Sequence, residues 1–392
     1  ETALFRKEIG WEYDPFEIPT EVYADFKEKV ADRGEAAYKV WEKLYDDYKT
    51  KYPELASELE EVLSRKDIER LSKESFGFKN VGEAQATRNS SQDAINSIAA
   101  VLPTFFGGSA DLSHSNMTFI KGEGLQDNEN RVARNVQFGV REFGMATILN
   151  GLMLHGGVRV FGGTFFVFSD YLKAALRLSA LQNLPVTYVF THDSIAVGED
   201  GPTHEPIEHL ASLRTIPNTY VFRPADATEA QAAWYLSQKV NNKPTSLVLT
   251  RQNLPILENT SFEKVSKGAY VVYETSSDFD TILIATGSEV ALAVDAAREL
   301  EKEGSKVRVV SMPSVELFEE QSKEYKEELL PRSVRRRVSL EMGNTALWYK
   351  YVGLDGLAIG IDNFGASAPA NKVIEEYGFT VAKVVERIKN EL

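Results

Sequence analysis

The sequence predicts an α/β protein with two successive doubly wound domains, built on mostly parallel sheets and preceded by a helical connector. From about residue 76 onwards, short apolar runs alternate with amphipathic stretches of helical length. This alternation is typical of parallel sheets that helices cover on both faces. Before that point glycine is rare and apolar residues recur every three or four positions, which indicates helices. We therefore expect three parts, at residues 1–75, 76–265 and 266–392.

The first part is predicted to be a helical connector packed on the outside of a domain. An apolar stripe with helical spacing runs through Ala37, Val40, Trp41, Leu44, Tyr45 and Tyr48. Three prolines, Pro15, Pro19 and Pro53, divide the segment into short helices. Because the first residue, Glu1, is not methionine, we expect a chain that begins within a longer protein.

In the second part, expected strands and helices alternate. The strands are expected at residues 135–140, 158–164, 185–191, 219–223 and 246–250. The helices are expected at residues 142–155, 170–183, 206–214 and 228–239. The polar motifs therefore fall where strands end and helices begin. Ligands bind at this carboxyl edge in open α/β sheets.

The third part shows a similar pattern, with strands expected at 280–285 and 306–311 and a helix at 289–304. The segment Ala285-Thr286-Gly287-Ser288 could serve as a phosphate loop, but it lacks both the three-glycine dinucleotide pattern and a following lysine. We expect a tight strand-to-helix turn there. The run Arg335-Arg336-Arg337 is expected to be solvated charge before a strand.

Charge and composition limit the partners. The net charge of -14 opposes binding to nucleic acid or to anionic membranes, so small molecules are the expected partners. No apolar stretch approaches the roughly 20 residues that a membrane helix needs. The chain has no cysteine, which is compatible with the reducing cytoplasm and excludes disulfide and thiolate chemistry.

Candidate functional residues begin with Glu142, which opens a predicted helix. It is followed by the aromatic side chains of Phe165, Phe168 and Tyr171, spaced three apart after two glycines. A carboxyl group beside aromatic faces suits a flat basic heterocycle. The alternative is a glutamate that interacts with the positive end of its helix.

Two of the five histidines, His192 and His204, flank a loop that contains Asp200. Imidazoles at a strand end can donate hydrogen bonds to sugar hydroxyls or to phosphate. Metal binding is the competing interpretation, but no close histidine and carboxylate spacing supports it, so no metal site is predicted.

The segments 139–145, 164–171 and 192–204 together resemble the transketolase family. The resemblance implies thiamine diphosphate as cofactor, with Glu142 as the carboxylate that activates its aminopyrimidine ring. It further implies that Phe165, Phe168 and Tyr171 line the ring site and that Asp111 acts near the ring through hydrogen bonds. Glu142 and His204 would be the catalytic residues.

The resemblance also implies a set of sugar-binding residues. Asp200 would bind the hydroxyl next to the acceptor's carbonyl, and His204 the oxygens of the donor. The phosphate group would be held by His192, Arg88, Ser115 and Arg251. An arginine fork suits phosphate because it can bind it with two hydrogen bonds. Glu205 stands where many relatives have glutamine.

The family activity is transfer of a two-carbon ketol unit from a ketose phosphate to an aldose phosphate in the pentose phosphate pathway. It implies a homodimer with active sites between the subunits. No Gly-Asp-Gly motif occurs, although the family uses one to hold Mg2+ or Ca2+ and the cofactor diphosphate. We therefore expect this chain to be the pyrimidine-binding and C-terminal portion, without the N-terminal diphosphate-binding domain and its metal ligands, and inactive alone.

Two alternatives remain. One is another thiamine diphosphate enzyme component, of the deoxyxylulose-phosphate synthase type or the 2-oxo acid dehydrogenase β type. Arg88, Ser115, Asp200 and Arg251 favour a sugar phosphate over a 2-oxo acid. The other is a non-catalytic module that binds sugar phosphate or assists assembly, which predicts binding without turnover.

Overall fold

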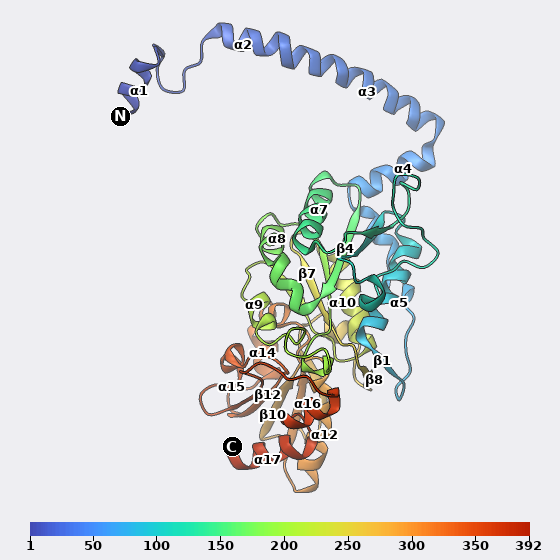
Figure 1. Cartoon of the computed structure of the whole chain (residues 1–392), viewed down its shortest axis with the longest axis vertical. Coiled ribbons are helices and arrows are strands. Elements are labelled where there is room, and N and C mark those ends of the chain that lie inside the picture. The colour runs from blue at the N-terminus through green and yellow to red at the C-terminus, as the bar shows by residue number, and fades with distance from the viewer. The chain divides into compact units, whose positions relative to one another are not determined.

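The computed structural model describes residues 1–392, which form two units, residues 1–64 and residues 65–392. The first unit contains helices but no strands (Figure 1), and its α-helices are α1 (Thr2–Glu8), α2 (Thr20–Phe26), α3 (Asp32–Lys51) and α4 (Pro53–Leu63). Pro53 opens α4 because its fixed φ suits the first helical position, where no N–H is needed. The aromatic stripe of α3 includes a stacked pair, Trp41 and Tyr45, with ring centroids 5.3 Å apart. No residue of α3 is buried.

The centre of the second unit is a six-stranded sheet in the order β3-β2-β4-β5-β7-β6. Its strands are β2 (Phe105–Ser109), β3 (Asn135–Gln137), β4 (Arg159–Phe165), β5 (Thr187–Thr191), β6 (Tyr220–Phe222) and β7 (Thr245–Leu249). Every neighbouring pair is parallel. A separate antiparallel pair joins β1 (Ala84–Ala86) to β8 (Asn253–Pro255).

Helices cover both faces of this sheet (Figure 1). One face packs against α5 (Thr87–Val101) and α10 (Ala227–Lys239). On that side the Phe105 and Phe161 rings stack with centroids 4.9 Å apart, and the Trp234 indole meets both edge-on. The other face packs against α7 (Glu142–His155) and α8 (Ser169–Leu181). The remaining helices of this region are α6 (Ser113–Asn116), α9 (His209–Arg214) and α11 (Phe262–Val265).

A five-stranded sheet follows in the order β13-β12-β10-β11-β9. Its strands are β9 (Tyr270–Glu274), β10 (Thr281–Ala285), β11 (Val307–Ser311), β12 (Arg336–Leu340) and β13 (Leu357–Ile359). Only β9, at one edge, is antiparallel to its neighbour. The helices of this part are α12 (Glu289–Lys302), α13 (Val315–Glu319), α14 (Lys323–Leu329), α15 (Tyr349–Val352), α16 (Ala370–Glu376) and α17 (Val381–Glu391). The predicted α/β class with mostly parallel sheets is confirmed.

Two local expectations from the third part of the sequence have different outcomes. The segment after β10 is a tight turn, because Gly287 has φ +55° and its N–H donates to the Arg223 carbonyl over 3.0 Å. The expectation of a solvated charge run is wrong for Arg337. Its guanidinium is partly buried and donates to four backbone carbonyls, those of Leu330, Pro331, Val334 and Tyr351. No helix in the chain is both long and apolar enough to cross a membrane.

Candidate functional site

The predicted site residues follow the carboxyl ends of the strands of the parallel sheet. Asp111 comes after β2, Glu142 after β3 and Phe168 after β4. His192 comes after β5, and Arg251 after β7. Because all these strands are parallel, their carboxyl ends lie along one edge of the sheet. The topology therefore places residues from distant parts of the sequence along one edge.

An aromatic and imidazole cluster forms at this edge. The rings of Phe165 and Phe168 are nearly parallel, at an interplanar angle of 9° and a centroid distance of 6.0 Å. The His192 imidazole lies against Phe165, with ring centroids 3.7 Å apart. His204 meets both phenylalanines edge-on, at centroid distances of 6.2 and 5.5 Å. The cluster joins the loops after β4 and β5 into one surface.

A chain of buried polar groups orients His192. The Thr191 hydroxyl donates to Asn116 Oδ1 over 2.8 Å and lies 2.8 Å from His192 Nδ1. Because that hydroxyl has given its proton to Asn116, it accepts one from Nδ1–H. Asn116 is held in turn through its Nδ2, which donates to Ser109 Oγ over 3.0 Å. This network leaves the Nε2 of His192 as the unprotonated nitrogen.

Positive charge surrounds His192. Burial, followed by the charges of Arg88, Arg251 and His204, lowers the pKa of His192 to about 3, so the imidazole is neutral at pH 7. Arg88 donates through Nη1 to the Ser115 carbonyl over 3.0 Å, and its buried Nε has no partner. Burial and the Arg251 cation lower the pKa of Arg88. No carboxylate pairs with either arginine, so this cluster is suited to an anion.

Glu142, Asp111 and Tyr171 are less closely tied to the cluster. Glu142 is the partly exposed first residue of α7 and has no hydrogen-bond or ion-pair partner. Asp111 is exposed and adopts φ +65°. Tyr171 contacts Phe168 through its ring, at a centroid distance of 6.1 Å, but is 67% exposed. All three side chains are accessible to a ligand or to another chain.

Asp200 lies in the loop between His192 and His204, where its side chain is exposed. Gly198 and Gly201 shape this loop with φ of +79° and +76°, in the left-handed region that favours glycine. The His204 N–H donates to the Gly201 carbonyl over 2.9 Å, and His204 Nδ1 lies 2.9 Å from the Thr203 hydroxyl. The loop thus places His204 beside the aromatic rings, while Asp200 projects from its exposed part.

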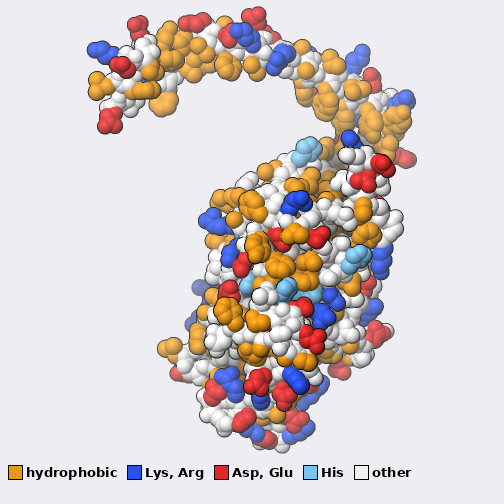
Figure 2. All heavy atoms as spheres, in the orientation of Figure 1, with side chains coloured by type: hydrophobic (Ala, Val, Ile, Leu, Met, Phe, Trp, Pro, Cys, Tyr) orange, Lys and Arg blue, Asp and Glu red, His pale blue; other side chains and the backbone are white.

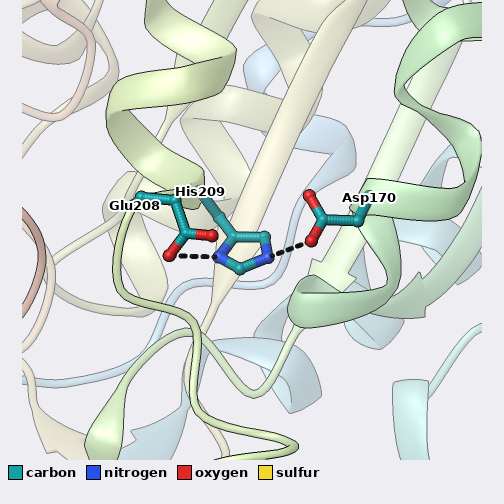
Figure 3. Close-up of side chains that lie close together, drawn as sticks. All are labelled: Asp170, Glu208 and His209. Carbon is teal, nitrogen blue, oxygen red and sulfur yellow. Dashed lines mark hydrogen bonds and ion pairs between the residues drawn. The ribbon is translucent and has the colours of Figure 1, made fainter. Parts of the chain in front are cut away.

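A third histidine, His209, lies between two carboxylates next to this region (Figure 3). Its Nε2 is 3.2 Å from Asp170 Oδ2, and its Nδ1 is 3.8 Å from Glu208 Oε2. The three side chains lie close enough for a metal ion. However, Asp170 already accepts from the imidazole and has the Lys173 ammonium 3.6 Å away. We interpret the group as a polar link between the starts of α8 and α9.

The sequence analysis did not predict the residues that hold the imidazole of His192 in the cluster. Asn116 and Thr191 are fully buried and orient His192, yet an asparagine and a threonine carry no distinctive spacing. The one available signal was the position of Thr191, immediately before the predicted histidine. Asp193, in the same motif, does not face the cluster, because it pairs with Arg223 in the interior.

Comparisons with known proteins give consistent results. The family model described as "Transketolase, pyrimidine binding domain" matches residues 83–256, and "Transketolase-like TK C-terminal domain" matches residues 268–380. A third model, "Transketolase, thiamine diphosphate binding domain", matches residues 1–67. The expectation that the chain lacks this domain is therefore wrong, and so is the inference that the ligands for the diphosphate and its metal belong to an absent domain.

Curated relatives and solved structures agree. A probable transketolase of Streptococcus pneumoniae is 66% identical over 390 residues, which are 100% of this chain and 59% of the relative. The transketolase of Bacillus subtilis is 51% identical over 99% of this chain and 59% of its own length. A Pichia stipitis transketolase structure with sedoheptulose 7-phosphate has a TM-score of 0.91 at 40% identity, covering 98% of this chain and 57% of its own. The chain thus spans less than two thirds of these relatives.

Proposed function

Because the three matching domain models assign this chain to the transketolase family, we propose that it takes part in thiamine diphosphate-dependent transfer of a two-carbon ketol unit. The donor would be a ketose phosphate such as xylulose 5-phosphate, and the acceptor an aldose phosphate such as ribose 5-phosphate. The observation that carries the proposal is the unpaired cationic cluster of Arg88 and Arg251 beside the aromatic and histidine surface.

The phosphate end of the sugar is assigned to Arg88, Arg251, Ser115 and His192. Both arginines lack a carboxylate partner, and a phosphate would satisfy the buried Nε of Arg88. A bound dianion would also offset the positive charges that, together with burial, now keep His192 neutral. We infer that phosphate binding protonates Nε2 of His192, which could then donate a hydrogen bond to a phosphate oxygen.

The residues at the sheet edge fit the cofactor's aminopyrimidine ring. Glu142 has a free carboxyl group, and Phe165 and Phe168 offer nearly parallel faces. We assign to Glu142 the hydrogen bond to the ring nitrogen, to Phe165, Phe168 and Tyr171 the ring contacts, and to Asp111 a nearby polar contact. When bound, thiamine diphosphate supplies a carbon nucleophile and an electron sink. We propose that Mg2+ or Ca2+ accompanies its diphosphate.

The loop after β5 supplies the sugar contacts. His204 projects from it beside Phe168, and we assign to it the donor oxygens and proton movement at the donor hydroxyl. Asp200 would accept a hydrogen bond from the hydroxyl next to the acceptor's carbonyl. Sugar phosphates are intracellular metabolites, so we propose a cytoplasmic location.

The alternatives can be separated by the same residues. A 2-oxo acid dehydrogenase component has no use for two unpaired arginines that bind sugar phosphate. A deoxyxylulose-phosphate synthase would share the ring site, but the curated relatives compared above carry the transketolase name. A non-catalytic module would bind sugar phosphate without turnover.

The test is ketol transfer from xylulose 5-phosphate to ribose 5-phosphate, with thiamine diphosphate and Mg2+ present. Arg251→Gln is expected to raise KM for ribose 5-phosphate about 10- to 100-fold, the loss of one charge-assisted contact, and to leave unphosphorylated ribose unaffected. Arg335→Gln, which removes an arginine outside the site, is the control. Unchanged discrimination between the two acceptors would contradict the phosphate assignment, and binding without turnover would favour the non-catalytic module.

We further propose a homodimer. The face formed by α7 and α8 carries exposed apolar side chains, and Figure 2 shows hydrophobic groups gathered there. They include Val140, Phe143, Ile148, Leu154, Tyr171 and Leu181. Such a patch marks a protein interface more often than free surface. Phe143→Glu should shift the mass measured by light scattering from dimer to monomer, whereas Leu354→Glu, exposed in the C-terminal part, should not.

A further inference from the structure

A segment of the C-terminal part, Gly365–Pro369, lies directly against the loop that carries Asp200 and His204. The Ser367 hydroxyl donates to the Glu199 carbonyl over 2.7 Å. The packing is close, because a Cβ placed on Gly198 would come within 2.8 Å of the Ala370 nitrogen. One placed on Gly201 would come within 3.0 Å of Ser367 Cβ. Contact between the two segments therefore restricts the loop's conformation.

Glu205 is the second point of contact. Its side chain is 2% exposed, and neither carboxyl oxygen has a partner at hydrogen-bond geometry. A Cβ on Gly365 would lie 1.7 Å from Glu205 Oε2, so any side chain at this position would force the Glu205 carboxyl group to shift. Burial raises the pKa of Glu205 to about 7, although the nearby N–H groups of Ala366 and Gly198 act to lower it. These two N–H groups belong to the two segments, and the carboxyl group lies between them.

We propose that Glu205 and the segment Gly365–Pro369 form a brace that holds the Gly198–Glu205 loop in place and so positions His204 and Asp200 for sugar binding. Glu205 acts through its neighbour His204 and is a positioning residue. The C-terminal part thereby gains a role at the sugar site. This inference rests on the proposed function for its catalytic consequence, but the brace itself is independent of turnover.

The neighbouring residue types support the brace. No cation acts on the pKa of the buried carboxyl group, and the one charge that does act on it, that of Asp200, is also negative and raises the pKa. A buried glutamate without a cation is more stable in its neutral form, which resembles a glutamine side chain in size and hydrogen-bonding groups. We infer that the neutral acid, like glutamine, is the form that supports the loop.

The brace can be tested in this chain by a measurement that does not depend on enzymatic activity. Hydrogen exchange measured by mass spectrometry should rise about three- to tenfold for peptides spanning residues 198–205 in Ser367→Ala, because one hydrogen bond between the segments is lost. The matched control is Ser266→Ala, which also loses an exposed serine hydroxyl bond to a backbone carbonyl, but a local one. Unchanged exchange of the loop in Ser367→Ala would overturn the brace.

A double-mutant cycle tests the contact between Glu205 and Gly365. Gly365→Ala should increase exchange of the loop more than about tenfold, because the new methyl group would collide with the carboxyl group. In a Glu205→Ala background the same change should have less than about a threefold effect. Equal effects in both backgrounds would show that the two residues do not act together. Gly77→Ala, with open space around its Cβ position, is the control.

Kinetics then separate positioning from the proposed function. In the ketol-transfer assay with thiamine diphosphate and Mg2+, Ser367→Ala should raise KM for both sugars about three- to tenfold, with a smaller change in kcat. Glu205→Gln should retain KM and kcat values close to those of the wild type. If the exchange results hold but no ketol transfer is detected, the brace stands and the proposed function fails. If transfer occurs and Ser367→Ala leaves KM unchanged, the brace has no role at the sugar site.

Discussion

Arg223 and Glu289 form a fully buried ion pair between the end of β6 and the first residue of α12. It joins the six-stranded sheet to the helix that follows β10 in the second sheet. On the other side, Arg223 Nη2 donates to Asp193 Oδ2 over 2.8 Å. Glu289 also accepts from the Met342 N–H over 2.7 Å. Buried charged groups thus connect the two sheets. Because water cannot solvate these charges, each of them needs its ionic partner.

Removing one member of this pair is expected to be strongly destabilising. Glu289→Ala leaves the Arg223 charge buried with only Asp193 as an ionic partner. Breaking a buried pair in this way costs about 3 to 5 kcal/mol of unfolding free energy. Urea denaturation, followed by tryptophan fluorescence, should show a clearly lower midpoint for the variant.

The control for that prediction is Glu303→Ala, which removes an exposed partner of Lys389. Exposed pairs contribute about 0 to 1 kcal/mol, so its midpoint should stay close to that of the unchanged protein. Similar losses in the two variants would mean that burial does not determine the contribution of the Arg223 pair.

Much of the fold could be predicted from the sequence, because apolar periodicity determines it. The predicted helix at 142–155 coincides with α7, and the strand predicted at 185–191 contains β5. Both elements have strong apolar runs between polar or glycine boundaries. The strand β2, Phe105–Ser109, was not predicted, since two of its five residues are glycines. Those glycines are required by packing, as a Cβ on Gly108 would lie 1.8 Å from the Val136 carbonyl oxygen.

The candidate site was predictable only in part. His192, Phe165 and Phe168 could be predicted to lie together because they follow neighbouring parallel strands, and their ring contacts agree. The hydrogen bond from Arg88 to the Ser115 carbonyl depends on how the start of α5 lies relative to α6 in space, which periodicity does not encode. The roles assigned to Glu142, Asp111 and Asp200 stay predictions.

The charge state of His192 gives a direct test of the proposed anion site. Burial, and after it the Arg88 and Arg251 cations, lowers the pKa of His192 to about 3, so removal of one cation should raise this pKa. Arg251→Gln is therefore expected to bring the His192 titration to higher pH, as followed by NMR of imidazole nitrogens labelled with 15N. Lys243→Gln, whose ammonium pairs with Glu320, should leave the titration unchanged. An unshifted titration in Arg251→Gln would exclude electrostatic contact between these two residues.

Glu205 should make the stability of the chain depend on pH. Its pKa is raised by burial from about 4.3 in the unfolded chain to about 7 in the folded one. The folded state then binds the proton more tightly, so this contribution is fully present below about pH 4.3 and is lost as pH rises through about 7. Glu205→Gln cannot titrate. Its stability relative to the unchanged protein should therefore increase by about 2 kcal/mol between pH 5 and pH 8.

The measurement for Glu205 is the apparent Tm of both proteins at each pH from 5 to 8. Glu199→Gln, which removes an exposed carboxylate from the same loop, provides the comparison. A difference between Glu205→Gln and the unchanged protein that stays constant over this range would show that Glu205 does not change its protonation there. The same result would weaken the view that its neutral form supports the loop.

Gly287 is expected to be irreplaceable for two separable reasons. Its φ of +55° disfavours any side chain, and a Cβ there would come within 2.7 Å of Arg223 Cζ. Gly304 has φ +91° but open space at its Cβ position. Gly304→Ala should therefore lose about 1 kcal/mol from backbone strain alone. Gly287→Ala should lose several times as much, because Arg223 cannot move away without breaking its buried bonds to Asp193 and Glu289. Equal midpoints of urea denaturation for the two alanine variants would mean that Arg223 has room to move, and that the buried pair is less rigid than its geometry indicates.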